Sequence, residues 1–338
     1  MEKRDGNRAG GERVNNIPVQ SENIAFGADE MIACGKCGRT NPPNRPSCFY
    51  CAAGLGISGD RAERVTPVFR KLEAWEKGYN VIYHPSGGEP SREGIAAAAK
   101  TVSLEPEVFK EITGSGRPMP VARVEGENEA AAIAEIMARY GFEASVIGDG
   151  ALAADVFPKR LRGLRFAGDA IILTLFNTGE TAQVAAGDLA LIVEGALFEQ
   201  KTETIEKRKK GKSKTLDESE TSSDEVLIDI YTGSDPAGWR ILTSGFDFSC
   251  LGPEKGLLAA QNIRKLIEKL RGFAPGARVA DDYLADRHSL GVVWEVEQRR
   301  DSQGLRRSGF GKTDFGKVAS TSNLGQFTKY SRLQWQLL

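Results

Sequence analysis

Cys34-Gly-Lys-Cys37 and Cys48-Phe-Tyr-Cys51 lie within eighteen residues and decide how the N-terminal part of this chain folds. Each Cys-x2-Cys turn brings two thiolates to one side of a tight loop, and two such turns complete a tetrahedral shell of sulfur ligands. The ten-residue spacer is too short to build a hydrophobic core, so a bound metal has to supply the folding free energy. The spacing predicts one structural Zn²⁺; a disulfide pair and an iron–sulfur site are the alternatives.

The cysteine pairs and the asparagine between them, Asn41, have the form C-x2-C-x3-N-x6-C-x2-C. This spacing resembles that of RanBP2-type zinc fingers and of the wider group of bacterial zinc ribbons. The chain departs from the RanBP2 pattern at Ile32, where those fingers carry a tryptophan. Five side chains near the cysteines could stack on an unpaired RNA base or form hydrogen bonds with it. The alternative is that they form only the surface and the small core of the ribbon. They are Arg39, Asn41, Arg45, Phe49 and Tyr50.

Length and composition place the chain among globular proteins. Its 338 residues suffice for about two domains and small modules, and 40% apolar with 27% charged residues is ordinary. The uninterrupted apolar stretches, such as 170–173, are far shorter than a membrane span, and the polar N-terminus lacks the apolar core of a secretory signal. We therefore expect a cytoplasmic protein with no membrane partner, which agrees with cysteines that must stay reduced. The net charge of −1 predicts no global attraction to nucleic acid.

The expected organisation is α+β, with several modules in sequence. A disordered leader over 1–30 precedes the zinc ribbon over 31–55 and a linker over 56–78, in which a short helix is expected near 68–75. Hydrophobic periodicity then predicts a β-α-α-β-α-β domain over 79–149. Its helices follow Ser91 as an N-cap, begin at Pro106, and end before Gly141.

The element order of 79–149, with Glu129-Ala130 opening its third helix, resembles the C-terminal domain of bacterial ribosomal protein L7/L12 and the ClpS adaptor fold. The next region, 150–275, shows short alternating strands followed by an amphipathic helix near 259–270. That pattern over 160–273 resembles an antiparallel pleckstrin-homology-like (PH-like) β domain with a C-terminal helix. Within it, a basic block followed by an acidic block predicts a mobile loop over 203–225 whose charges nearly cancel.

The C-terminal region 276–338 is expected to contain a short helix near 281–290 and a basic, aromatic tail over 299–335. Basic residues alternating with aromatic ones suit single-stranded nucleic acid, since cations hold phosphates and rings stack on bases. The alternative is that the tail packs on the parent domain, its last apolar residues alternating as in a final strand from Leu333 to Leu338.

Catalytic patterns are missing from the sequence. There are only two histidines, His84 and His288, and neither lies in a recognisable catalytic or metal-binding motif. We therefore expect a non-catalytic cytoplasmic binding or adaptor protein with one structural Zn²⁺, whose partner is a protein. The alternative is RNA or ribosome association through Arg39, Asn41, Phe49, Tyr50 and the 299–335 tail.

Overall fold

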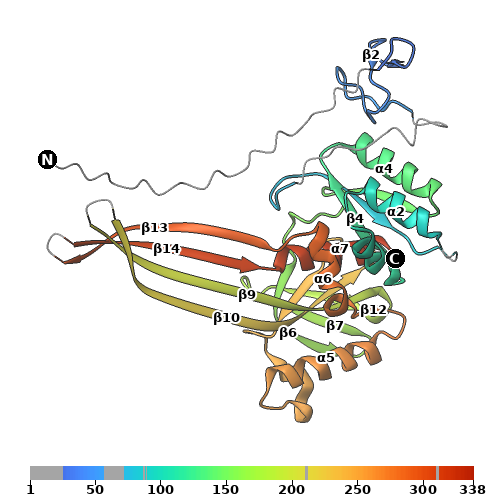
Figure 1. Cartoon of the computed structure of the whole chain (residues 1–338). Helices are drawn as coiled ribbons and strands as arrows, with labels where there is room; N and C mark the ends of the chain where they lie inside the picture. Colours follow the sequence, from blue (N-terminus) through green and yellow to red (C-terminus); the bar gives the residue numbers. More distant parts are fainter. Residues whose placement is uncertain (1–25, 57–71, 87, 89, 210–211, 310–311) are drawn as a thin grey trace, which may run out of the picture.

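The computed structural model describes residues 26–56, 72–86, 88, 90–209, 212–309 and 312–338. The ribbon contains two short antiparallel strands, β1 (Ile32–Ala33) and β2 (Thr40–Asn41), and it lies beside helix α4 in Figure 1. The predicted leader lies largely outside the described residues, as does the first half, 68–71, of the predicted helix over 68–75. Of that helix only 72–75 is described, and these residues form a loop and turn.

Residues 79–148 confirm the predicted order of three strands and three helices. Ser91 caps the first helix, because its side chain accepts a hydrogen bond of 3.0 Å from the Gly94 backbone N–H. Gly141 ends the third helix with φ of +85°. The strands form a small antiparallel sheet in the order β4-β3-β5. The elements are β3 (Tyr79–Tyr83), α2 (Arg92–Thr101), α3 (Pro106–Gly114), β4 (Met119–Val124), α4 (Glu127–Arg139) and β5 (Ala144–Gly148).

A nine-stranded sheet dominates the rest of the described chain, in the order β13-β14-β9-β10-β11-β6-β7-β8, with β12 pairing β9. The sheet is mixed, whereas the sequence predicted an antiparallel one. β11 runs parallel to β6 and β12 runs parallel to β9, because each of these late strands pairs with a strand that is distant in sequence. The strands are β6 (Lys159–Ala167), β7 (Ala170–Leu175), β8 (Thr181–Ala185), β9 (Leu189–Lys209), β10 (Lys212–Thr232), β11 (Trp239–Leu242), β12 (Arg278–Ala280), β13 (Glu297–Gly309) and β14 (Lys312–Ser322).

Hydrophobic cores lie on both faces of β9 and β10. Side chains alternate along β9, so that Leu191 and Val193 join one core while Ile192 joins the other. The second core includes the predicted amphipathic helix, which is confirmed as α5 (Ala259–Phe273). The first core includes α6 (Tyr283–Val293) and α7 (Leu324–Gln336), together with the buried side chains of β3, β4 and α4. The units predicted over 79–149 and 150–275 therefore share one core.

Two segments differ from the sequence-based expectation. The described residues of the predicted loop, 203–209 and 212–225, lie in β9 and β10, which pair from Leu189 to Thr232. The predicted basic, aromatic tail forms the β13–β14 hairpin and then helix α7, where the sequence favoured a final strand. Phe327, Tyr330 and Leu333 of α7 are buried in the first core at helical spacing, so packing decided this segment. Between β11 and α5 the chain forms a 3-10 helix, Phe248–Glu254.

The four long strands form an extension that we call the arm: residues 199–209 of β9, 212–225 of β10, and all of β13 and β14. Figure 1 shows the arm projecting from the body that carries α5, α6 and α7. At about 3.3 Å per residue, eleven residues of β9 extend over roughly 35 Å. The described part of the chain therefore consists of a helix-covered body, a β arm and a ribbon beside α4.

Candidate metal centre and the buried polar network

Two equivalent backbone turns hold the four cysteines. In the first turn the Gly38 N–H donates to the Cys34 carbonyl at 2.8 Å, and in the second the Ala52 N–H donates to the Cys48 carbonyl at 2.9 Å. The residue after each pair is left-handed, with φ of +71° at Gly38 and +56° at Ala52. The first position is occupied by glycine, which adopts this conformation at little steric cost.

The four sulfur atoms converge on one point. The Sγ atoms of Cys34, Cys37, Cys48 and Cys51 all lie within 4.8 Å of one another. Two pairs, Cys34–Cys51 and Cys37–Cys48, are 3.6 Å apart. A tetrahedral ion with bonds of about 2.3 Å to sulfur separates its ligands by about 3.8 Å, whereas a disulfide requires about 2.05 Å. The arrangement therefore fits a four-coordinate metal ion, and these cysteines could hold one such as zinc.

Hydrogen bonds prepare two of the four sulfurs to be thiolates. Backbone N–H groups, first that of Cys37 and then that of Lys36, lower the pKa of Cys34. Burial opposes ionisation of Cys48, but hydrogen bonds from the Tyr50 and Cys51 backbone and from Asn41 lower its pKa to about 6. The deprotonated sulfur is the form that binds metal.

The neighbours of the Cys51 sulfur oppose its ionisation. The Ala53 backbone N–H favours the thiolate of Cys51, yet burial and the surrounding cysteine sulfurs raise its pKa to about 12. A bound divalent cation would relieve the repulsion between thiolates that lie this close together.

Asn41 supports the metal centre and is not part of the ribbon surface. It is fully buried, its Nδ2 donates to the Arg39 carbonyl at 2.9 Å and lies 3.4 Å from Cys48 Sγ, and its Oδ1 accepts from the Phe49 N–H at 2.8 Å. These bonds occupy both ends of the amide. In this arrangement the Asn41 amide is bonded inside the ribbon, where it orients a ligand loop.

Phe49 and Tyr50, between the second pair of cysteines, form the exposed aromatic part of the ribbon. Their side chains are 68% and 53% exposed, and their rings meet edge to face at 85° with centroids 5.5 Å apart. The Arg39 guanidinium lies 4.6 Å from the centroid of Tyr50, and that of Arg45 lies 5.1 Å from the centroid of Phe49. Each ring therefore has one face covered by a cation.

The ribbon contacts the body at the first turn of α4. Asn128 Nδ2 donates to the Ala52 carbonyl at 2.7 Å, directly behind the second pair of cysteines. The neighbouring carboxyl of Glu129 has a raised pKa because it is partly buried and lies near Glu125, and the charge of Arg45 opposes this effect. These contacts hold the metal centre against a helix of the 79–149 unit.

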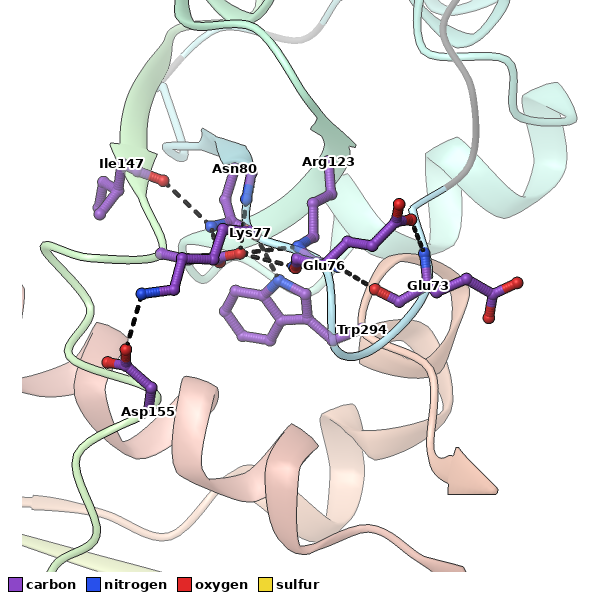
Figure 2. Close-up of polar contacts among 10 residues, drawn as sticks. Glu73, Glu76, Lys77, Asn80, Arg123, Ile147, Asp155 and Trp294 are labelled. Carbon is purple, nitrogen blue, oxygen red and sulfur yellow. Dashed lines mark hydrogen bonds and ion pairs between the residues drawn. The ribbon is translucent and has the colours of Figure 1, made fainter. Parts of the chain in front are cut away.

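A buried polar network, which sequence reasoning missed, joins the 79–149 unit to the C-terminal helices (Figure 2). Trp294, at the end of α6, donates its Nε1–H to Asn80 Oδ1 at 2.7 Å. Asn80 Nδ2 in turn donates to the Ile147 carbonyl at 3.0 Å and to Asp149 Oδ1 at 2.8 Å. Asn80 is a polar residue inside an otherwise apolar strand, and this was the signal available in the sequence.

Arg123 completes the network on the other side of Asp149. Its Nη2 lies 2.5 Å from Asp149 Oδ2, and its guanidinium also donates to the carbonyls of Glu73 and Glu76, as Figure 2 shows. Burial disfavours the charged carboxylate, but hydrogen bonds from Arg123 and Asn80 outweigh it and lower the pKa of Asp149. The network ties the 73–77 segment, β4 and β5 together.

A hollow of about 180 Å³ adjoins this network and is lined by Lys329, Trp75 and Glu297 among others. Burial, assisted by the nearby charge of Arg123, lowers the pKa of Lys329 to about 8. Among the described residues that line the hollow there is no cysteine or histidine. It therefore offers an amine among carboxylates and the Arg123 guanidinium.

The two histidines of the sequence lie apart from this hollow. His84 Nε2 lies 2.7 Å from Ser145 Oγ, which accounts for one ring nitrogen. His288 belongs to α6 and lines a separate open hollow with Arg287 and Asn323. Neither lies among the cysteines that form the cluster fit for a metal ion in the described chain.

No protein-family model, curated protein or solved structure matches the chain. Among the helices of the described residues, none combines the length and the apolar character needed to cross a membrane. The functional argument therefore depends on the geometry of the ribbon, the network and the arm.

Proposed function

We propose that the chain is a non-catalytic binding protein in which a structural Zn²⁺ orders the ribbon, and Phe49 and Tyr50 contact a protein partner. The observation that carries this proposal is the placement of two exposed rings between two metal-ligand positions, braced by Arg39 and Arg45. Aromatic and arginine side chains supply much of the binding energy at protein interfaces. A metal-fixed loop lowers the entropy lost when such side chains bind.

The geometry of the rings favours a protein over an RNA base at this surface. Base stacking needs an open ring face, but each ring has a guanidinium over one face and the two rings stand nearly perpendicular. RNA association through Arg39, Phe49 and Tyr50 is the second candidate, supported by the positive charge of both arginines. Its binding would weaken steeply with salt, whereas a mainly apolar protein interface would not.

Zinc is proposed over iron because nothing in the ribbon requires redox chemistry and a closed set of four thiolates is typical of structural zinc. Cytoplasmic location is proposed on the same ground, since four metal-binding thiolates must remain reduced. The strand and helix order supports an L7/L12- or ClpS-like fold for 79–149. The PH-like interpretation of 160–273 keeps only its strands followed by helix α5, since the sheet is mixed and continues to β13 and β14. These resemblances concern architecture and do not supply an activity.

The test is affinity capture from bacterial lysate with the full-length protein, in nuclease-treated and untreated halves, with zinc measured in parallel. We expect about one zinc per chain and protein partners that survive nuclease. The double variant Phe49→Ala, Tyr50→Ala should lose the protein partners but keep its zinc. Cys48→Ser should lose both the zinc and the partners. Phe157→Ala, which removes an aromatic ring 87% exposed outside the ribbon, is the matched control and should keep them.

Three results would count against the proposal. Partners that disappear on nuclease treatment would support the RNA candidate. Retention of the same partners by the Phe49 and Tyr50 variant would exclude this surface. Unchanged metal content in Cys48→Ser would refute the metal centre.

A further inference from the structure

The hollow beside the buried network contains an amine that has no partner in the described part of the chain. Lys329 of α7 lines this hollow of about 180 Å³. The charged groups that act on its pKa are Arg123, Asp149 and Glu297, and all three line the same hollow, so the amine end of Lys329 faces it. Within the described residues this amine forms no hydrogen bond and no ion pair. It is therefore open to a ligand or a reactant.

The carboxylates of the hollow are already engaged with other groups. Each of the four accepts a hydrogen bond from a residue other than Lys329. The pairs are Asp149 with Arg123, Asp155 with Lys77, Glu297 with Arg299, and Glu76 with the backbone N–H of Glu73. Lys329 is partly buried, and an amine that is buried without a partner lowers stability, whereas a methionine would fill similar space without that cost. The amine is better explained by a molecule that enters the hollow.

The surroundings of the amine favour an uncharged molecule over an anion. Helix α7 begins at Leu324, and a helix N-terminus attracts anions, but the Glu297 carboxylate already occupies this one. A Cβ placed on Gly325 would collide with Glu297 Oε1, which shows how closely the carboxylate approaches the first turn. With four carboxylates and the three cations Lys77, Arg123 and Lys329, the lining has a net charge of −1. A further negative group would be repelled.

The amine is partly uncharged at neutral pH. Burial, and then the charge of Arg123, lower the pKa of Lys329 to about 8, while Asp149 and Glu297 act in the opposite direction. At pH 7 roughly one such amine in ten is unprotonated, against about one in three thousand for a lysine with a pKa of 10.5. The unprotonated amine is the nucleophile in reactions with carbonyl groups.

We propose that Lys329 is a carbonyl-binding site, at which its amine condenses with a small, uncharged aldehyde to form an imine. The Nζ lone pair forms a bond to the carbonyl carbon, and a proton passes from nitrogen to oxygen. The C–O bond then breaks, and the oxygen leaves as water with the second N–H proton. One amine and one aldehyde give one imine and one water, without an oxidant or a reductant. The iminium formed by protonation of the imine lies near Glu297 and Asp149, which stabilise its charge.

The size of the hollow limits the aldehyde. A water molecule takes about 30 Å³ in the liquid, so the space corresponds to roughly six non-hydrogen atoms. Trp75, whose side chain is 76% exposed, lines the hollow with an aromatic surface suited to an aliphatic chain. Short aliphatic aldehydes therefore fit, whereas a fused aromatic aldehyde does not.

The experiment treats the full-length, zinc-loaded protein with propionaldehyde and sodium cyanoborohydride, which reduces the iminium to a stable secondary amine. Peptide mapping by mass spectrometry measures the propylated fraction of each lysine. Lys77 is the matched control within the same molecule, because it lines the same hollow but is paired with Asp155 (Figure 2), which raises its pKa. Lys329→Met and Lys77→Met are the corresponding variants, and 2-naphthaldehyde is the oversized probe.

We expect Lys329 to be propylated at least tenfold faster than Lys77 at pH 7. The ratio of the two rates should fall by about tenfold from pH 7 to pH 9, because the free-base fraction approaches its maximum for Lys329 and still rises about tenfold per pH unit for Lys77. Groups that face the amine from the other elements are Glu76, Arg123, Asp149 and Glu297, and the ratio also reports their titration. Relative to Lys77, 2-naphthaldehyde should label Lys329 at least tenfold less than propionaldehyde does.

Equal propylation of Lys329 and Lys77 at pH 7 would overturn the proposal, and so would a ratio that does not change with pH. Efficient labelling of Lys329 by 2-naphthaldehyde would refute the role of the hollow. Both comparisons are made within the wild-type protein, so they do not depend on the folding of a variant. Lys329→Met should lose this product and Lys77→Met should keep it. The double variant Phe49→Ala, Tyr50→Ala should be propylated at Lys329 like the wild type, which separates this site from the ribbon and its partner.

Discussion

The substitution Asp149→Ala tests whether the buried network holds the 79–149 unit to the rest of the body. Asp149 Oδ2 accepts hydrogen bonds from the Gly78 N–H and from the Arg123 guanidinium, and Oδ1 accepts from Asn80. Only 10% of the Asp149 side chain and 5% of the Arg123 side chain are exposed. The substitution therefore leaves a buried cation and two buried N–H donors without their acceptor.

The magnitude follows from this geometry. Breaking a buried ion pair by removing one partner costs about 3–5 kcal/mol, because the other charge stays buried without compensation. Arg123 keeps its bonds to the carbonyls of Glu73 and Glu76, so the lower end of that range applies. We expect Asp149→Ala to lower the free energy of unfolding by about 3 kcal/mol, roughly a hundredfold change in the folding equilibrium.

The assay is urea unfolding at pH 7, followed by tryptophan fluorescence and circular dichroism. Asp155→Ala is the control, since its ion pair with Lys77 lies nearby but is exposed, and we expect no measurable change in its unfolding midpoint. The double variant Arg123→Met with Asp149→Leu should recover part of the loss, because it removes the buried charge together with its partner.

The pH dependence of the Asp149→Ala effect is a further check. The pKa of Asp149 is lowered below 3.8 in the folded protein, so its stabilisation is present above pH 3.8 and is lost as the pH falls through the folded pKa. The difference in unfolding free energy between the wild type and Asp149→Ala should therefore become smaller as the pH falls below 3.8. A loss below about 1 kcal/mol at pH 7, or a double variant no more stable than Asp149→Ala, would refute the reasoning.

Three other predictions concern single sites. Because burial lowers the pKa of Lys329 from 10.5 to about 8, the unfolded state binds more protons than the folded state between these pH values, and the free energy of unfolding relative to Lys329→Met should rise by up to about 3 kcal/mol from pH 7 to 10. A difference in unfolding free energy that does not change with pH would contradict the burial of the amine. Asp229 is buried, forms two hydrogen bonds of 2.7 Å with Arg240 and accepts one from Ser331 of α7, so Asp229→Ala should lower the free energy of unfolding by about 3–5 kcal/mol and speed hydrogen exchange of the α7 amides. Unchanged exchange in α7 would show that other contacts hold the helix. Gly38 has φ of +71°, where an alanine costs about 1 kcal/mol, so Gly38→Ala should weaken zinc binding about fivefold in a competition with a chelator. Equal zinc affinity of the variant and the wild type would show that the turn relaxes.

Local elements were predictable where their signals are local. The helix after Ser91, the helix opening at Pro106 and the amphipathic helix α5 all occur where caps and periodicity indicated. The cysteine cluster was predictable for the same reason, since two short turns bring the ligands together. The sequence left open whether Asn41 contacts RNA or forms part of the ribbon's surface or small core, because cysteine spacing does not reveal that its amide bonds inside the ribbon.

The arm was not predictable from local signals. Opposite charges over 203–225, with no apolar periodicity, are typical of a solvated loop, yet this segment pairs as β9 and β10. The pairing of β14 with β9 joins segments about a hundred residues apart, so no window of sequence contains it. The C-terminal alternation from Leu333 to Leu338 suggested a strand, but burial of Phe327, Tyr330 and Leu333 in one core gives a helix.

The sequence by itself determined the two cysteine turns and most of the short helices and strands, because caps, glycines and cysteine spacing act over a few residues. Only the tertiary structure decided which charges are neighbours. It buried Asp149 against Arg123, and it paired β14 with β9 across about a hundred residues of sequence. The physical reason is that electrostatic energy depends on distance and burial in space, and these are set by long-range strand pairing and not by position along the chain.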